Sequence, residues 1–158
     1  MAQQAVRTDV DLRAWVPFLR AHASITRRLN QELVAEHGLT LNDYEVLLFL
    51  SRASDRRMRR VDLANSVLLT ASGITRLLEG LERAGYVRRR ACETDARVVY
   101  AELTDEGIAK LRAASRTHLA GIRRLFVDQF DEPELDTLAS LFGRLAGGQT
   151  ADEACGVD

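Results

Sequence analysis

The stretch from Arg60 to Thr104 constrains the fold more than any other part of the chain, because it combines two helical patterns with two β-prone runs. The second helical pattern begins after Thr70 and ends at Gly85, residues that suit a helix N-cap and the left-handed position after a helix. Four apolar residues recur in it at helical spacing and predict one buried face. They are Ile74, Leu77, Leu78 and Leu81. The first helix of the pair is expected over Val61–Val67.

The two β-prone runs, Tyr86–Arg90 and Arg97–Leu103, enclose a polar turn and predict a hairpin, to which Met58–Arg60 is expected to add a short strand. A helix-turn-helix followed by a hairpin is a winged helix, so the expected fold is mainly α with a small β-wing. In such proteins the leading residues of the second helix meet base edges in the major groove. The residues expected to contact DNA are Thr70, Ser72, Gly73, Thr75 and Arg76 on the helix, and Arg88 and Arg90, through phosphates, on the hairpin.

The charge distribution supports a polyanionic partner, although the net charge of −1 hides it. Residues 52–97 hold 11 Arg and 6 Asp or Glu, whereas the rest of the chain holds 11 Lys or Arg and 17 Asp or Glu. A basic block between acidic flanks is expected of a face that meets phosphates. The same block also suits a solvated arginine-rich surface. Double-stranded DNA is therefore the expected partner, and a winged-helix protein-interaction module without DNA binding is the alternative.

Amphipathic helices are predicted on the N-terminal side of this stretch. The first covers Asp11 to about Glu36, either kinking at Pro17 or beginning close before it, and Gly38 ends it. The second is predicted to open at Asn42, whose side chain caps while Glu45 reaches back in a capping box.

Two more helices are predicted on the C-terminal side. One is capped by Thr104 and runs to about Gln129, and the last starts near Asp131 with Pro133 in its first turn. Amphipathic helices at both ends of a small chain suggest a layer shared with a second copy, which would place two recognition helices roughly 34–36 Å apart on a pseudo-palindromic site. The expected organisation is a disordered N-terminus (1–9), dimerisation helices (10–36 and 104–146), a winged-helix DNA-binding domain (42–103) and a disordered tail (147–158).

Composition and motifs exclude several other classes. A hydrophobic content of 46% without a long apolar run, and only 2 Cys, indicate a cytoplasmic globular protein with no membrane span and no disulfide framework. His22, His37 and His118 are scattered without metal-ligand spacing. Neither a nucleophile elbow nor a glycine-rich phosphate loop is present, so we expect no cofactor and no enzymatic activity.

Three motifs together resemble the multiple-antibiotic-resistance-regulator (MarR) family. They are Leu-Glu-x-x-Gly-Tyr-Val over Leu81–Val87, Asp95-x-Arg97, and Leu-Thr-x-x-Gly over Leu103–Gly107, and the resemblance covers roughly residues 10–146. It implies that the terminal helices form a homodimer, that Arg97 enters the minor groove, and that Asp95 orients it. Members often carry a second arginine where this chain has Ala96, which puts one phosphate contact in doubt.

A second resemblance concerns an effector. A subgroup of that family that responds to urate and related small aromatics carries residues of the same kinds as Trp15, Tyr44-Glu45 and Arg89. It implies a repressor that is released when a small aromatic anion binds among Trp15, Glu45 and Arg89, and His22, on the same helix as Trp15, is a further candidate contact. Cys92 lies near arginines that could lower the pKa of its thiol. The family's peroxide sensors carry their reactive cysteine in the first helix, however, where this chain has none.

Overall fold

The computed structural model of this protein describes residues 12–67, 69–95 and 97–145. The chain forms two compact units, and the boundary between them falls after His118, inside one continuous helix. The segments predicted to be disordered, 1–9 and 147–158, lie outside the described residues, as does Ala96. Among the described residues, no helix combines the length and the apolar character needed to cross a membrane.

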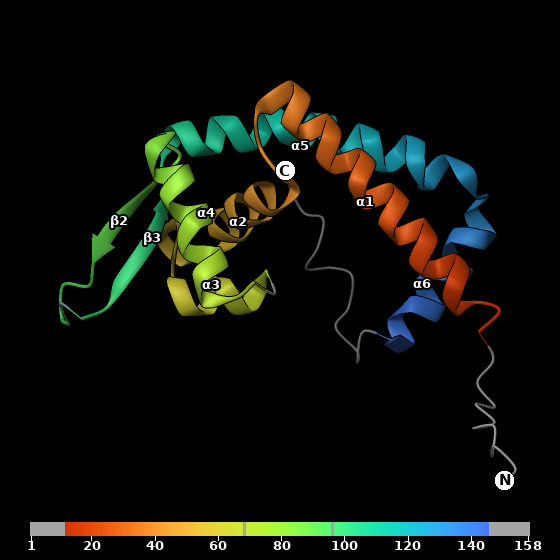
Figure 1. Ribbon diagram of the computed structural model, residues 1–158, viewed down its shortest axis with the longest axis horizontal. Helices are drawn as coiled ribbons and strands as arrows, with labels where there is room; N and C mark the ends of the chain where they lie inside the picture. The colour runs from red at the N-terminus through yellow and green to blue at the C-terminus, as the bar shows by residue number, and fades with distance from the viewer. Residues whose placement is uncertain (1–11, 68, 96, 146–158) are drawn as a thin grey trace, which may run out of the picture. The chain divides into compact units, whose positions relative to one another are not determined.

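The described elements are mostly helical, with one small antiparallel sheet in the order β1-β3-β2 (Figure 1). In chain order they are α1 (Trp15–His37), α2 (Leu41–Arg52), the 3-10 turn η1 (Ser54–Arg56), β1 (Arg57–Arg59), α3 (Arg60–Ser66), α4 (Ala71–Arg83), β2 (Val87–Ala91), β3 (Val99–Leu103), α5 (Asp105–Leu125), η2 (Val127–Gln129) and α6 (Glu132–Leu145). The predicted winged helix with flanking helices is confirmed, including the extra strand that pairs with the hairpin.

The ends of α1 follow from two residues that the sequence singles out. The helix begins at Trp15, so Pro17 lies in its first turn, where a missing backbone N–H removes no intrahelical hydrogen bond. Gly38 ends it with a φ of 65°, a left-handed conformation that favours glycine. The alternative of a kink at Pro17 is therefore not the one adopted.

The prediction that Asn42 caps α2 is wrong. Thr40 is the N-cap: its Oγ1 accepts a hydrogen bond from the Asp43 N–H (3.1 Å), and the Asp43 carboxylate accepts one from the Thr40 N–H (2.8 Å). The capping box thus lies two residues earlier than predicted, and Glu45 takes no part in it. An earlier start suits the chain because it follows directly on Leu39, which is buried in the core.

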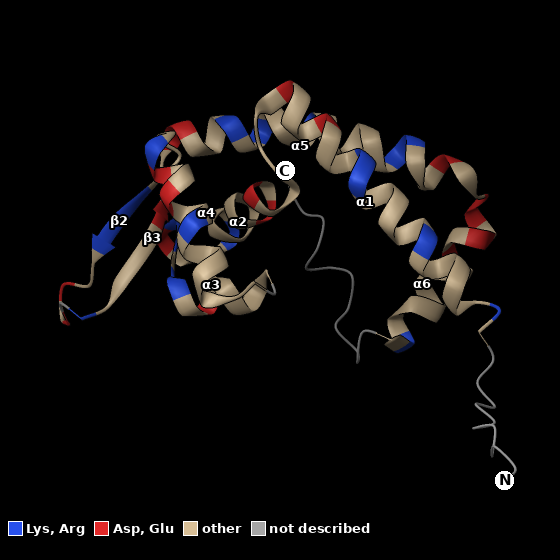
Figure 2. Ribbon diagram, viewed as in Figure 1, with Lys and Arg blue, Asp and Glu red and all other residues tan. Residues whose placement is uncertain are grey.

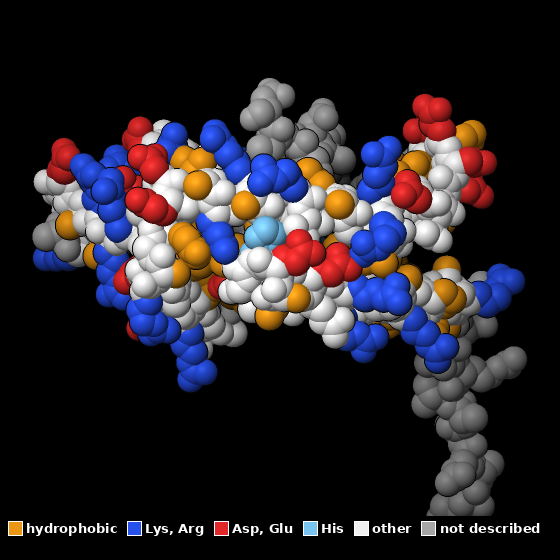
Figure 3. Space-filling view, turned by 90° about the horizontal axis from the view of Figure 1, so that it is seen from above, with side chains coloured by type: hydrophobic (Ala, Val, Ile, Leu, Met, Phe, Trp, Pro, Cys, Tyr) orange, Lys and Arg blue, Asp and Glu red, His pale blue; other side chains and the backbone are white. Residues whose placement is uncertain are grey.

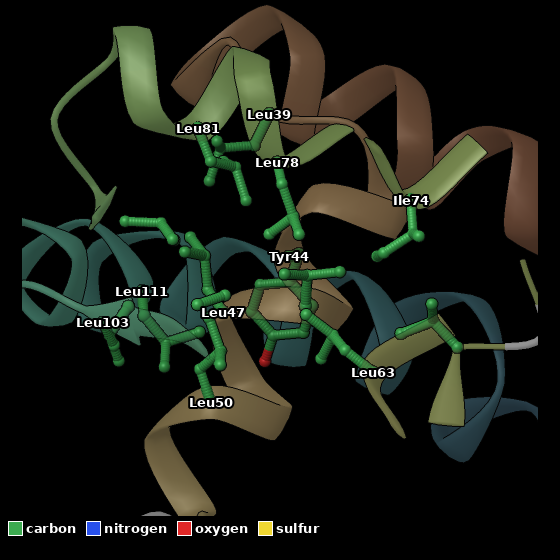
Figure 4. Packing of buried hydrophobic residues seen from close by; sticks show 14 of the residues in the cluster. Leu39, Tyr44, Leu47, Leu50, Leu63, Ile74, Leu78, Leu81, Leu103 and Leu111 are labelled. Carbon is green, nitrogen blue, oxygen red and sulfur yellow. The ribbon is translucent and has the colours of Figure 1, made fainter. Parts of the chain in front are cut away.

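One apolar core joins the winged helix to parts of α1 and α5 (Figure 4). Leu47 of α2, Leu63 of α3 and Ile74 of α4 are fully buried in it. The same cluster takes in Leu33 from α1 and Leu111 and Ala114 from α5. These helices therefore complete the interior against which α4 packs, the helix predicted to meet base edges and called the recognition helix below.

The second unit holds the end of α5, η2 and α6. Helix α5 ends at Leu125, a turn earlier than predicted, because Phe126 leaves the helical conformation. Asp131 caps the next helix, accepting a hydrogen bond from the Glu134 N–H (2.9 Å). No residue of α6 is buried within the described chain.

Candidate nucleic-acid interface

The N-terminus of α4 is fixed by a side-chain cap. Thr70 Oγ1 accepts a hydrogen bond from the Gly73 N–H (3.1 Å), as its role as N-cap predicts. A Cβ on Gly73 would lie 3.1 Å from that same oxygen, so a larger residue would press on the cap. The opposite face of the helix is anchored, with Ile74, Leu78 and Leu81 buried. The polar leading edge is thereby fixed while facing away from the core.

Along that edge, Ser72 and Arg76 are exposed. Thr75 is partly buried, and its hydroxyl donates a hydrogen bond to the Ala71 carbonyl (2.8 Å), which leaves the hydroxyl oxygen as an acceptor for a ligand. A helix N-terminus also carries partial positive charge, which favours anions such as phosphate. Donors, an acceptor and a dipole therefore converge at one end of α4.

The outer face of the wing carries paired arginines. The strand register places Arg88 opposite Glu102, and the Glu102 carboxylate accepts hydrogen bonds from Arg88 and from Arg90 (3.5 Å). The hydrogen bond from Arg88 lowers the pKa of Glu102, whose side chain is only 13% exposed. The basic run of β2 (Figure 2) therefore meets an internal counter-ion, which reduces the charge that these two arginines offer to phosphate.

The inner face of the wing is tied to α4 through Arg89. Its Nε donates to both carboxylate oxygens of Glu82, at 2.8 and 3.0 Å. Arg89 also lines a cavity of about 400 Å³ together with Thr75 and Leu78 of α4 and with Tyr100 of β3. Sequence reasoning did not identify Glu82 or Glu102 as partners. Glu102 could have been found by assuming a hairpin register that pairs Val87 with Leu103, because that register places Glu102 opposite Arg88.

The wing tip is shaped by Asp95. Its carboxylate accepts a hydrogen bond from the backbone N–H of Arg97 (3.0 Å), and its carbonyl accepts one from the Val98 N–H (3.0 Å). Arg97 is exposed, and within the described residues neither its guanidinium nor that of Arg76 forms an ion pair. Elsewhere on the wing, at the left of Figure 3, acidic side chains lie among the arginines.

Cys92 precedes the tip. Its Sγ lies 3.3 Å from Thr94 Oγ1, and this hydrogen bond lowers the pKa of the thiol. Among the described residues, no group of His, Cys, Asp and Glu could hold a metal ion.

The four residues predicted to bind an effector do not all meet at the cavity beside Arg89. Trp15, His22 and Glu45 are absent from its lining. Trp15 is 52% exposed on α1, and successive ring contacts run from it through Phe18 to His22, with centroids 6.0 and 6.3 Å apart. Glu45 is partly buried, which raises the pKa of its carboxyl. The shared effector pocket stays a prediction.

Comparisons with known proteins agree on a family. Residues 37–98 match the model of the MarR family. The HTH-type transcriptional repressor YetL of Bacillus subtilis is 33% identical over 77% of this chain and 77% of its own length. AbsC, a MarR family transcriptional regulator from Streptomyces coelicolor, superposes with a TM-score of 0.79 at 34% identity, covering 89% of this chain and 94% of AbsC. Sco3205 from the same organism, solved in complex with DNA, gives 0.78 at 28% identity, covering 87% of each chain.

Proposed function

Because this chain belongs to the MarR family of DNA-binding transcription regulators, and is not an enzyme, we propose that it is a homodimeric repressor of a pseudo-palindromic operator. Two relatives support this. YetL is named as a repressor, and the structure of Sco3205 holds DNA. In the proposal, α4 enters the major groove and the wing tip enters the adjacent minor groove.

The contrast between paired and unpaired arginines carries the proposal. Arg88, Arg89 and Arg90 each face a carboxylate at the base of the wing, whereas Arg76 and Arg97 face none among the described residues. An exposed cation without a counter-ion gains most from a phosphate, a base edge or a narrow minor groove. Both positions lie on the elements proposed to enter the grooves, which favours DNA binding over a protein-interaction module.

Exposed apolar side chains support the homodimer. Several lie at or just before the start of α1 in the first unit, and others lie on α6 in the second. They include Leu12, Trp15, Val16 and Leu19 in the first unit and Leu141 and Leu145 in the second. Exposed apolar side chains gathered on a helix suit an interface, and a two-fold axis would set the recognition helices roughly 34–36 Å apart, one turn of DNA.

A gel-shift experiment with the DNA upstream of the protein's own gene tests operator binding. We expect the wild type to retard this duplex at about 150 mM salt, with Arg97→Ala about tenfold weaker and Arg90→Ala less affected, because Glu102 already neutralises part of Arg90. Equal binding to the upstream duplex and to a scrambled duplex would contradict the proposal.

For release, we propose a small aromatic anion, with Trp15, His22, Glu45 and Arg89 as the candidate contacts. Trp15 offers a stacking face, and Arg89 offers a bidentate partner for a carboxylate. Since Glu82 already accepts hydrogen bonds from Nε of Arg89, an anion at Arg89 competes with that carboxylate.

Titration of urate and salicylate, followed by the fluorescence of the single Trp, tests this assignment. We expect potency to fall in Arg89→Ala and to rise in Glu82→Gln, provided each variant first retains operator binding. If a ligand released the DNA without changing the Trp15 fluorescence, and with the same potency in both variants, the effector would bind elsewhere.

A further inference from the structure

The start of α5 is hydrogen-bonded to the turn between α4 and β2. The Thr104 N–H donates to the Tyr86 carbonyl (3.1 Å), and Thr104 Oγ1 donates to the Gly85 carbonyl (2.7 Å). The same Oγ1 accepts a hydrogen bond from the Gly107 N–H (3.0 Å). One threonine thus links the first turn of α5 to two successive carbonyls of the turn. We call this arrangement the turn latch.

Gly107 brings the latch into close contact. A Cβ at this position would lie 2.6 Å from Leu103 Cδ1 and 2.2 Å from the Tyr86 carbonyl oxygen, a backbone atom that could move away only if the turn shifted. One turn further along α5, the Lys110 ammonium lies 5.7 Å from the centroid of the Tyr86 ring. The helix therefore contacts the turn by hydrogen bonds, by backbone packing and by a cation–π contact.

The turn separates the two elements proposed to contact DNA. Arg76 lies on α4 before it, and Arg97 lies on the wing after it. Gly85, with a φ of 79°, is a flexible point in the chain unless its neighbours hold it. The relative direction of α4 and the wing depends on whatever fixes this turn.

We propose that Thr104 is a positioning residue for DNA binding: its hydroxyl fixes the wing relative to the recognition helix, so that both reach their grooves together. This inference rests on the proposed function, because it uses operator binding as one readout. Since α5 is one helix from Asp105 to Leu125, the latch also connects the turn to the helix that both compact units share.

Two variants of Thr104 separate the effect of the hydroxyl group from the effect of side-chain shape. Thr104→Val is isosteric and removes both hydroxyl hydrogen bonds, whereas Thr104→Ser retains them. Ser115→Ala is the matched control, because it also removes a hydroxyl partner on α5, that of Tyr44 (3.2 Å), but away from the turn. All three variants are compared at temperatures where thermal unfolding shows them to be folded.

The first readout needs no DNA. Amide hydrogen exchange of Val87–Ala91 is expected to accelerate at least about fivefold in Thr104→Val and to stay at the wild-type rate in Thr104→Ser and Ser115→Ala. An unchanged rate in Thr104→Val would overturn the latch whatever the operator results show.

The second readout is a double-mutant cycle on the operator. Thr104→Val should weaken binding about tenfold, and Arg97→Ala, which costs about tenfold in the wild type, should cost less than about threefold in the Thr104→Val background. Fully additive losses would overturn the positioning role. If Arg97→Ala has no effect even in the wild type, the wing contact of the proposed function fails, while the exchange result still decides the latch.

Discussion

The winged-helix region and α6 place similar apolar residues in opposite surroundings. In the former, Leu47, Leu63 and Ile74 are 0% exposed within the chain. On α6, Leu141 is 43% exposed and Leu145 is 76% exposed. The winged-helix region therefore buries its apolar residues within the chain, with help from α1 and α5, whereas the apolar residues of α6 are left for contacts outside the described chain. Folding and assembly should consequently respond to different sets of mutations.

The largest expected effect comes from the core. Leu47→Ala should destabilise the protein by about 3 kcal/mol, because it removes a fully buried side chain and leaves a cavity. Urea unfolding followed by circular dichroism would measure this loss. Leu145→Ala is the matched control and should change stability little when measured at concentrations where the protein is monomeric. Equal losses in the two variants would contradict the comparison.

The next largest effect should appear in assembly. Leu141→Asp combined with Leu145→Asp should keep the helical content but give a monomer in sedimentation equilibrium. Operator affinity should then fall by on the order of a hundredfold, because each half-site is bound alone. Ser140→Ala, on the exposed surface of the same helix, is the control. A dimer that survives both aspartates would show that α6 is not its interface.

A smaller effect concerns specificity. Arg76 is exposed and takes no part in the core, so Arg76→Ala should leave unfolding unchanged. It should cost about 1–3 kcal/mol of discrimination at particular base pairs. Selection from a randomised operator would detect the flattened positions, and Arg90→Ala should retain the wild-type consensus while weakening all sequences alike. The same consensus from Arg76→Ala and the wild type would remove Arg76 from base readout.

The smallest expected effect is a pH dependence where α2 meets α5. Burial lowers the pKa of His118, whose ring centroid lies 4.5 Å from that of Tyr44 and whose Nδ1 has no partner among the described residues. Because the folded state disfavours the charged ring, stability is fully present above the ordinary histidine pKa of 6.5 and falls as pH drops below it. His118→Phe should lose this slope, as thermal unfolding between pH 7.5 and 5.5 would show. Parallel slopes in the two proteins would assign the effect to other groups.

The sequence predicted those parts of the fold that local chemistry decides. Gly38 and Gly85 both adopt the left-handed conformation expected of them, and Thr70 and Thr104 both cap helices. The start of α2 was missed because two overlapping capping boxes fit the sequence. Only the burial of Leu39 favours the earlier one.

The charge partners on the wing could not be found in the same way. Glu82 lies 7 residues from the arginine that it binds, and Glu102 lies 14 and 12 residues from its two arginines. Their pairing therefore depends on strand register and on the packing of β2 against α4. The proposed contact of Arg76, in contrast, follows from its position on the helix, and that of Arg97 follows from the wing motif that resembles the family. Sequence therefore identified the arginines but not which of them were already neutralised.

The shared interior of the winged helix sets a limit on protein engineering. Leu33, Leu111 and Ala114 fill the same core as the recognition helix, although they lie outside residues 42–103. A fragment cut at those limits would expose part of this core to water and should aggregate. A chimaera that grafts this DNA-reading head onto another dimerisation scaffold must therefore carry the end of α1 and the first three turns of α5 with it.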